Sequence, residues 1–178
     1  MSTLPLVSAD RETPEQTTAL SAVRQALGST PNLTRVMVHS PALVHGYLAM
    51  AGNLAEGVLS AATRERLAIA VAQSNGCSYC LSAHSYLGEN VAGLSREQVG
   101  AARKADADDP KTAALLAFAV AVNEQRGDVG DDVVATVRAA GATEAEIAEV
   151  IGHVALNVLT NYLNNAARTE IDFPVVQA

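Results

Sequence analysis

The sequence predicts an all-α fold, for three reasons. Signals that start helices recur along the chain, and no segment alternates apolar and polar residues between hairpin turns. The hydrophobic residues make up 49% of the chain but the aromatic residues only 3%, so the core must be built from Ala, Val, Leu and Ile, which suit closely packed helices. At 178 residues the chain has the length of one domain and can be stable without disulfide bonds.

Capping residues along the chain predict where the helices begin. Residues 1–12 are expected to be a mobile N-terminal segment. Helices should begin where a capping residue precedes a proline, because the cap satisfies a free backbone donor and proline preorganises the first turn. These starts are Thr13-Pro14, Ser40-Pro41 and Asp109-Pro110. Gly28 ends the first of these helices, and the last runs to Gly127.

Other helices start at capping boxes, in which two side chains satisfy each other's free backbone donors. The pairs with this spacing are Ser95 with Gln98 and Thr143 with Glu146. A helix over about Ala61–Ser74 should end at Asn75-Gly76, residues that tolerate the left-handed conformation that closes a helix. The next helix then begins at or near Cys77.

The connections between these helices are expected to be short. Loops are predicted around Asp106–Asp109 and Asp128–Asp132, and we therefore expect residues 13–178 to form a single helical domain. Part of the apolar excess should lie at an interface between copies of the chain.

The net charge and the cysteine content limit the classes of partner. A net charge of -7 opposes binding to nucleic acid or anionic lipid, so neither is an expected partner. The longest apolar runs, such as Leu115–Val122, are far shorter than the ~20 residues of a membrane span. Two cysteines in an acidic chain without an apolar leader do not resemble the disulfide framework of a secreted domain, so we expect a cytoplasmic protein.

The chain's two cysteines occur in the stretch SNGCSYCLSAH, residues 74–84. If a helix starts at Cys77, then Cys80 at +3 and His84 at +7 share its face. The partial positive charge of a helix N-terminus favours thiolate over thiol. A C-x-x-C pair can also close a disulfide within one turn, which is the chemistry of a dithiol oxidoreductase.

Glu65 lies on the preceding predicted helix, twelve residues before Cys77. It shares a face with Ala68, Ile69 and Ala72, so its carboxylate is expected to point inward. A carboxylate on an apolar face is costly unless it is partnered or protonated. Glu65 is therefore a candidate base or proton relay for the thiols.

Two other interpretations of these residues remain open. Cys77 and Cys80 could be buried structural cysteines. Together with His84 and Glu65 they could also form a zinc set, although a closed zinc site normally joins segments that would not fold without it. Neither interpretation involves redox chemistry.

The pattern of Glu65, the Cys77–Cys80 pair and His84 resembles the E-x11-C-x-x-C-x-x-x-H signature of the alkylhydroperoxidase D-like branch of the carboxymuconolactone decarboxylase superfamily. The similarity runs from about Pro31 to the segment HVALNVLTNYLNNAARTEIDFP and is closest to the peroxidase-related members. Some members carry a histidine between the two cysteines, where this chain has Tyr79. The resemblance implies an all-helical fold that assembles as a homo-oligomer, a trimer or hexamer.

For chemistry, the resemblance implies a thiol-dependent peroxidase that acts on organic or hydrogen peroxides. Cys80 would be the peroxidatic thiol, Cys77 its resolving partner, and Glu65 with His84 the proton relay. An external dithiol, of the dihydrolipoamide type or a thioredoxin-like protein, would reduce the disulfide. This scheme uses no cofactor or metal. The alternatives are a disulfide carrier for a protein partner and a non-catalytic oligomeric module that binds metal.

A polar stripe marks the helix that follows Thr143. Its members recur at spacings of four, four and three residues, and they are His153, Asn157, Asn161 and Asn164. The stripe could form a pocket wall or a subunit contact, but buried side chains that satisfy helix ends are the favoured interpretation. Tyr47 and Tyr86 are candidates for lining a pocket near the thiols.

Overall fold

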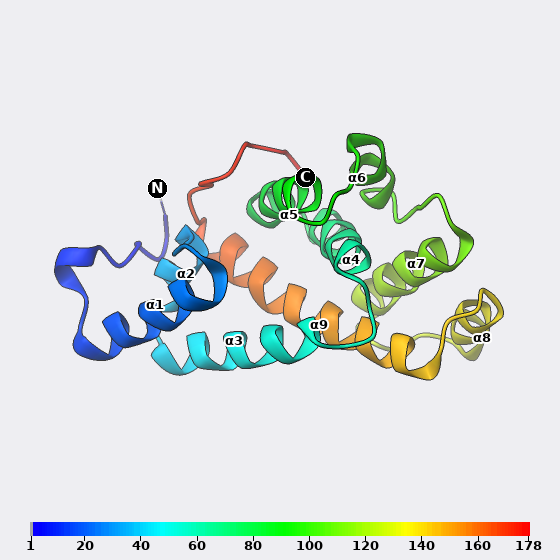
Figure 1. Ribbon diagram of the computed structural model, residues 1–178, viewed down its shortest axis with the longest axis horizontal. Coiled ribbons are helices and arrows are strands. Elements are labelled where there is room, and N and C mark those ends of the chain that lie inside the picture. Colours follow the sequence, from blue (N-terminus) through cyan, green and yellow to red (C-terminus); the bar gives the residue numbers. More distant parts are fainter. Residues whose placement is uncertain (1) are drawn as a thin grey trace.

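The computed structural model describes residues 2–178, and within this range the chain contains helices and no β-strand. The all-α prediction is confirmed. A short 3-10 helix, η1 (Ala9–Arg11), precedes the α-helices, which are labelled in Figure 1. Their bounds are α1 Pro14–Leu27, α2 Asn32–Met37, α3 Pro41–Ala55, α4 Ala61–Ser74, α5 Ser78–Asn90, α6 Arg96–Ala102, α7 Pro110–Glu124, α8 Asp131–Ala139 and α9 Glu144–Ala167.

The predicted helix starts are confirmed by their side-chain caps. The side chains of Thr13, Ser40 and Asp109 each accept a hydrogen bond from the backbone N–H three residues ahead. Both capping boxes are present, at the starts of α6 and α9. A cap of this kind stabilises a helix by about 1 kcal/mol, so these local pairs fix where the helices begin.

Two helices lie where the sequence patterns gave no start. The short helix α2 has Pro31 at its N-cap without a side-chain cap. Helix α8 also lacks a side-chain cap and follows Gly130. Asp131 and Asp132 form its first turn, where negative charge complements the helix dipole. The loop expected over Asp128–Asp132 therefore ends at Gly130.

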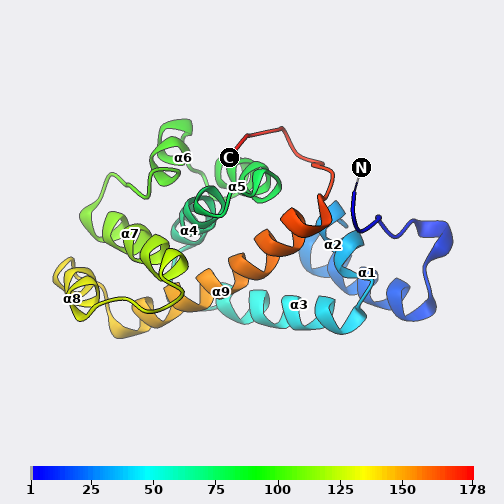
Figure 2. The ribbon, with the colours of Figure 1, turned by 180° about the vertical axis from the view of Figure 1, so that it is seen from behind.

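Helix α4 is the centre of the fold. It packs against α5, α7 and α9. Figures 1 and 2, which view the molecule from the front and from behind, show α4 lying between these helices. Every residue from Arg66 to Ala72 is buried. Full burial of a side chain such as Leu67 or Ile69 contributes about 1.5–3 kcal/mol. Helix α4 therefore provides a rigid support for Glu65, which directly precedes this buried run.

A smaller apolar cluster joins α1, α2 and α3, with Val23, Met37 and Val44 among its buried members. The N-terminal segment lies against it, since Val7 is buried and its backbone N–H donates to the carbonyl of Arg35 at 3.0 Å. The mobility of residues 1–12 and the single domain over residues 13–178 stay predictions, and Met1 lies outside the described residues. No helix between residues 2 and 178 is both long and apolar enough to cross a membrane.

Candidate active site

The turn between α4 and α5 places both cysteines at the start of α5. Gly76 adopts a left-handed conformation with φ of 61°, which reverses the chain after α4. Cys77 is the N-cap of α5, and its Sγ atom accepts the backbone N–H of Cys80 at 3.3 Å. The predicted helix start at Cys77 is confirmed, and the sulfur itself takes the place of a capping oxygen.

The two cysteines are free thiols in different electrostatic environments. Both are buried, with exposed fractions of 0% for Cys77 and 3% for Cys80. A hydrogen bond from the Cys77 side chain lowers the pKa of Cys80 to about 7, with contributions from the amide of Asn164 and the charge of His84 that overcome the opposing effect of burial. The same hydrogen bond, together with burial, raises the pKa of Cys77. At pH 7 roughly half of the Cys80 side chains are therefore thiolates, while Cys77 stays a thiol.

His84 and Glu65 form a close pair beside the thiols. The Nδ1 atom of His84 lies 2.8 Å from Oε2 of Glu65, and both side chains are half-buried. Burial by itself would lower the pKa of His84, but the Glu65 carboxylate and the Cys80 thiolate outweigh it, and the net effect is a raised pKa. The structure thus brings together the predicted acid–base pair, and it favours the imidazolium form.

Asn164 is a site residue that the sequence analysis did not assign. Its Nδ2 atom donates to Cys80 Sγ at 3.2 Å, and this contact helps to lower the pKa of Cys80. Asn161 lies three residues earlier on α9. Asn161 Oδ1 in turn accepts from Nδ2 of Asn75 at 2.9 Å, which ties α9 to the turn before the cysteines. The polar stripe on α9 was the available signal, but its spacing does not reveal which side chain reaches a sulfur.

Tyr79 lies between the two cysteines in sequence, but its hydroxyl bonds to other parts of the fold. The hydroxyl donates to Oδ1 of Asp172 at 2.7 Å and accepts the backbone N–H of Leu33 at 3.0 Å. The ring meets Phe173 edge to face, with centroids 5.9 Å apart. Burial raises the pKa of Tyr79. Tyr79 therefore anchors the C-terminal segment and α2, and it makes no hydrogen bond to either thiol or to His84.

A cavity of about 220 Å³ adjoins the His84–Glu65 pair. It is lined by residues of α3, α4, α5 and α9, and by Leu27 of α1. Tyr47 lines it, and burial raises the pKa of this tyrosine, with the charges of Cys80 and Glu65 adding to the effect. Of the two tyrosines considered from sequence, Tyr47 lies beside the site, whereas Tyr86 lines a separate hollow under the C-terminal segment.

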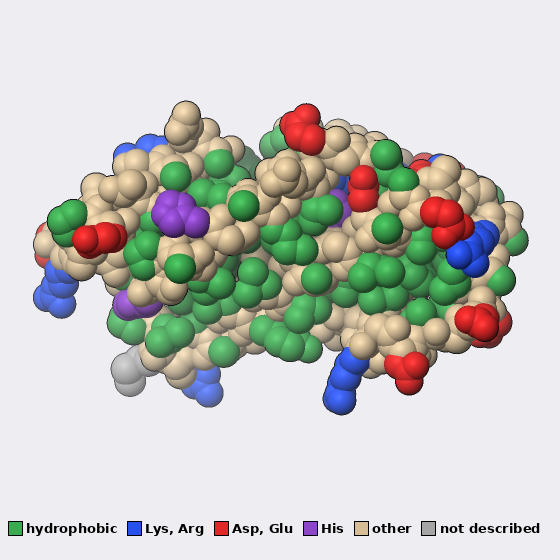
Figure 3. All heavy atoms as spheres, turned by 90° about the horizontal axis from the view of Figure 1, so that it is seen from below, with side chains coloured by type: hydrophobic (Ala, Val, Ile, Leu, Met, Phe, Trp, Pro, Cys, Tyr) green, Lys and Arg blue, Asp and Glu red, His purple; other side chains and the backbone are tan. Residues whose placement is uncertain are grey.

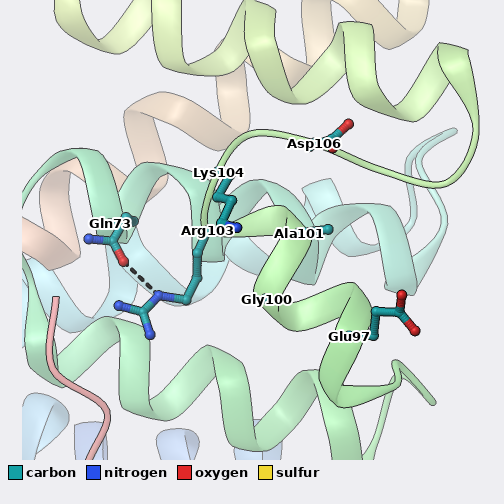
Figure 4. A pocket seen from close by; sticks show the side chains of 7 residues that line it. All are labelled: Gln73, Glu97, Gly100, Ala101, Arg103, Lys104 and Asp106. Atoms are coloured by element: carbon teal, nitrogen blue, oxygen red, sulfur yellow. Dashed lines mark hydrogen bonds between the residues drawn. The ribbon is translucent and has the colours of Figure 1, made fainter.

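A larger hollow lies elsewhere on the surface. Its volume is about 760 Å³, and it is lined by Gln73 of α4 and by residues of α6 and the loop that follows it (Figure 4). Arg103 donates to Oε1 of Gln73 at 2.7 Å across it. No cysteine or histidine lines this hollow, whereas His84 and Glu65 line the smaller cavity, which is therefore the candidate substrate site.

The arrangement of the four motif residues does not support a metal centre. In residues 2–178, no group of three or more His, Cys, Asp or Glu side chains is arranged to hold a metal ion. The contact of His84 with Glu65 and that of the Cys77 sulfur with the Cys80 backbone fit acid–base and thiol chemistry.

Comparison with known proteins gives a sequence match over part of the chain. Residues 41–109 match the carboxymuconolactone decarboxylase family. This segment runs from the start of α3 to the N-cap of α7 and includes Glu65, both cysteines and His84. Among curated proteins, none matches the chain.

Solved structures match over almost the whole chain. An alkylhydroperoxidase AhpD core protein, an uncharacterized peroxidase-related protein from Ralstonia eutropha JMP134, has a TM-score of 0.81 at 22% identity, over 96% of this chain and 92% of that chain. A peroxidase-related protein from Silicibacter sp. TM1040 has a TM-score of 0.79 at 20% identity, over 94% and 89%. The debrominase Bmp8 has a TM-score of 0.78 at 19% identity, over 97% and 93%. At these identities the similarity establishes a shared fold.

Proposed function

We propose that the chain belongs to the AhpD-like branch of the carboxymuconolactone decarboxylase superfamily, on the match of residues 41–109 and the shared fold, and that it is a thiol-dependent peroxidase that reduces organic or hydrogen peroxides. The observation that carries the proposal is the asymmetry of the dithiol. The pKa of Cys80 is lowered to about 7, whereas that of Cys77 is raised. Peroxide reduction needs one thiolate as nucleophile and one nearby thiol as resolving group.

In the proposed first step, the Cys80 thiolate attacks the terminal oxygen of the peroxide. The O–O bond breaks, the sulfur becomes a sulfenic acid, and the alkoxide or hydroxide leaves. The leaving oxygen takes a proton from the His84 imidazolium, whose positive charge Glu65 stabilises at 2.8 Å. A positioned general acid of this kind typically contributes about 10²–10⁴-fold to the rate.

In the second step, the Cys77 sulfur attacks the sulfenic acid. A disulfide forms between Cys77 and Cys80, and the hydroxyl leaves as water with the proton of the Cys77 thiol. An external dithiol then returns two electrons and two protons, becomes a disulfide itself, and restores both thiols. No metal or organic cofactor takes part in this cycle.

Burial of the dithiol favours a small oxidant over a protein disulfide. Cys80 is 3% exposed and Cys77 is fully buried, so the disulfide of a folded protein would have to enter the core to reach either sulfur. We propose that a peroxide approaches through the cavity that His84 and Glu65 line. For the same reason, the expected reductant is a slender dithiol such as a dihydrolipoyl arm, with a thioredoxin-like protein as the less favoured donor.

The test is a peroxidase assay with dihydrolipoamide as reductant on wild type and on two single-cysteine variants. We expect Cys80→Ser to lose peroxide consumption. Cys77→Ser should still react once, giving a sulfenic acid that dimedone labels and mass spectrometry detects, but it should not turn over. Wild-type consumption no faster than that of Cys80→Ser would reject the peroxidase function. Disulfide formation with an oxidised protein partner but not with peroxide would favour the carrier.

We also propose that the protein is a homo-oligomer, a trimer or hexamer. Figure 3 shows hydrophobic side chains spread across the face of the molecule on the side of α3. Helix α9 in addition exposes 47% of Ile151 and 60% of Tyr162. Contiguous apolar surface on a soluble protein commonly marks an interaction site. Light scattering coupled to size-exclusion chromatography gives the mass directly, and a single species at 18.4 kDa would contradict this proposal.

A further inference from the structure

The cavity beside His84 has a polar end that the peroxidase cycle does not use. His153 lines it, is 6% exposed, and leaves its Nε2 atom buried without a hydrogen-bond partner in residues 2–178. A buried nitrogen with no partner costs about 1–3 kcal/mol. A ligand that enters the cavity can supply this missing partner.

Arg64 lines the same cavity and carries a positive charge. Its Nη1 atom donates to the carbonyl of Leu59 at 2.6 Å, and no described carboxylate lies within ion-pair distance of its guanidinium. The nearby carboxylate of Glu149 accepts the backbone N–H groups of Val58 and Leu59 and does not line the cavity. Arg64 therefore has bonding capacity left for a ligand.

The charged residues of the lining sum to a positive value. Glu65 contributes a negative charge, and it is paired with His84 at 2.8 Å. With His84 as the imidazolium these two pair with each other, and Arg64 is the charged lining residue that has no ion-pair partner within residues 2–178. An unpaired guanidinium in the wall of a cavity favours an anionic ligand there.

The order of residues along α9 separates the two ends of the cavity. His153, Asn157 and Thr160 line it in succession, and Asn164, one turn further, bonds to Cys80. Seven residues of helix, from His153 to Thr160, span about 10 Å. A ligand group that accepts a hydrogen bond from His153 would thus lie roughly 10 Å from the end of the cavity nearest Cys80. The lining between them includes Leu87 and Leu156, which suit an apolar linker.

We propose that this cavity selects compact organic peroxides that carry a carboxylate, with Arg64 and His153 binding the carboxylate and the peroxide group lying at the His84 end. The inference rests on the proposed peroxidase function and adds the substrate class. The cavity of about 220 Å³ is smaller than the range of about 300–1,000 Å³ for pockets that hold drug-sized ligands. It can therefore enclose a compact peroxide, but not the whole of a long-chain lipid hydroperoxide.

Binding of an unreactive analogue tests the site without any turnover. Isothermal titration calorimetry would compare 4-isopropylbenzoate with 4-isopropylbenzamide, which has nearly the same shape and no charge. We expect the benzoate to bind wild type at least about tenfold more tightly, which corresponds to about 1.4 kcal/mol. Equal affinity for the two compounds would overturn the inference.

Variants show which residues produce the preference for the benzoate over the benzamide. Arg64→Gln should bring the two affinities together, and Arg64→Lys should retain part of the preference because it keeps the charge. His153→Leu should weaken benzoate binding without changing amide binding to the same extent. Arg96→Gln is the matched control, since Arg96 lies far out on the surface with 92% of its side chain exposed, and it should keep the full preference. A preference that survives in Arg64→Gln would also overturn the inference.

Turnover separates this inference from the function on which it rests. Wild-type kcat/KM should be higher for cumene hydroperoxide with a para carboxylate than for cumene hydroperoxide itself. If hydrogen peroxide is consumed but the two organic peroxides react equally, the peroxidase function stands and the substrate class is wrong. If no peroxide is consumed, the function fails, and the calorimetric comparison alone decides whether the cavity binds a carboxylate.

Discussion

The side-chain amide of Asn164 donates a hydrogen bond to the sulfur of Cys80 at 3.2 Å. The two residues lie 84 positions apart in the sequence, so the last α-helix takes part in the chemistry of the dithiol. A hydrogen bond to a charged acceptor is worth about 1.5–3 kcal/mol. Asn164 therefore stabilises the thiolate directly, and it is a catalytic residue in the proposed cycle.

Removing this donor should raise the pKa of Cys80. For Asn164→Ala we expect an increase of roughly one unit, because one unit corresponds to about 1.4 kcal/mol of thiolate stabilisation. The thiolate absorbance at 240 nm, followed against pH, measures the shift. Asn165→Ala is the matched control, since the Asn165 side chain donates to the backbone of Asn75 and not to a sulfur. An unchanged titration in Asn164→Ala would mean that the contact does not stabilise the thiolate.

Cys77 should be the stronger of the two thiolate donors, since its hydrogen bond is the largest cause of the lowered pKa of Cys80. We expect Cys77→Ala to raise that pKa by more than Asn164→Ala does. Cys77→Ser keeps a donor at the same position and should shift it less. The pH dependence of alkylation by iodoacetamide in the single-cysteine variants gives both values. A smaller rise of the Cys80 pKa in Cys77→Ala than in Cys77→Ser would contradict the assignment.

The reactivity of the wild-type dithiol should rise with pH around neutrality. Only the thiolate reacts, and the pKa of Cys80 is about 7, so the fraction of thiolate increases as the pH rises through this value. The rate of sulfenic acid formation in Cys77→Ser, measured by stopped flow with hydrogen peroxide, should follow the pKa titrated in that variant. A rate that is flat between pH 5 and 8, about two units below and one above the wild-type value, would argue against thiolate attack.

Glu65 should hold the proton on His84. In Glu65→Gln the carboxylate charge is lost while burial remains, so the pKa of His84 should fall below its ordinary value. The imidazolium then disappears at neutral pH, and we expect peroxide turnover to drop by about 10²-fold. Titration of the His84 ring by NMR reports the shift, and Glu97→Gln on the surface of α6 serves as the control. Full activity in Glu65→Gln would remove the pair from the cycle.

Tyr79 should affect the C-terminal segment and leave the thiols unchanged. Tyr79→Phe removes the hydrogen bonds to Asp172 and Leu33, at a cost of roughly 1–3 kcal/mol. Amide exchange in residues 170–178 should become faster, while the pKa of Cys80 and peroxide turnover stay within about twofold of wild type. A large loss of turnover with slow exchange retained would instead place Tyr79 in the proton relay.

The helix starts could be predicted because capping is local. A residue such as Thr13 or Ser95 acts on a backbone N–H three positions ahead, so the pair is visible in the sequence. The starts of α2 and α8 lack side-chain caps. These helices form because their apolar residues pack on the rest of the fold, and no short pattern records that packing.

The sequence by itself determined the all-α class, the turn at Gly76 that presents Cys77 and Cys80 at a helix start, and the presence of Glu65 and His84 on neighbouring helices. These features depend on local backbone preferences and on helical periodicity. The tertiary structure decided that Asn164 reaches Cys80, that Tyr79 bonds to Asp172, and that Arg64 and His153 share a cavity. Contacts of this kind join helices far apart in the chain, and their geometry is set by how the whole core packs.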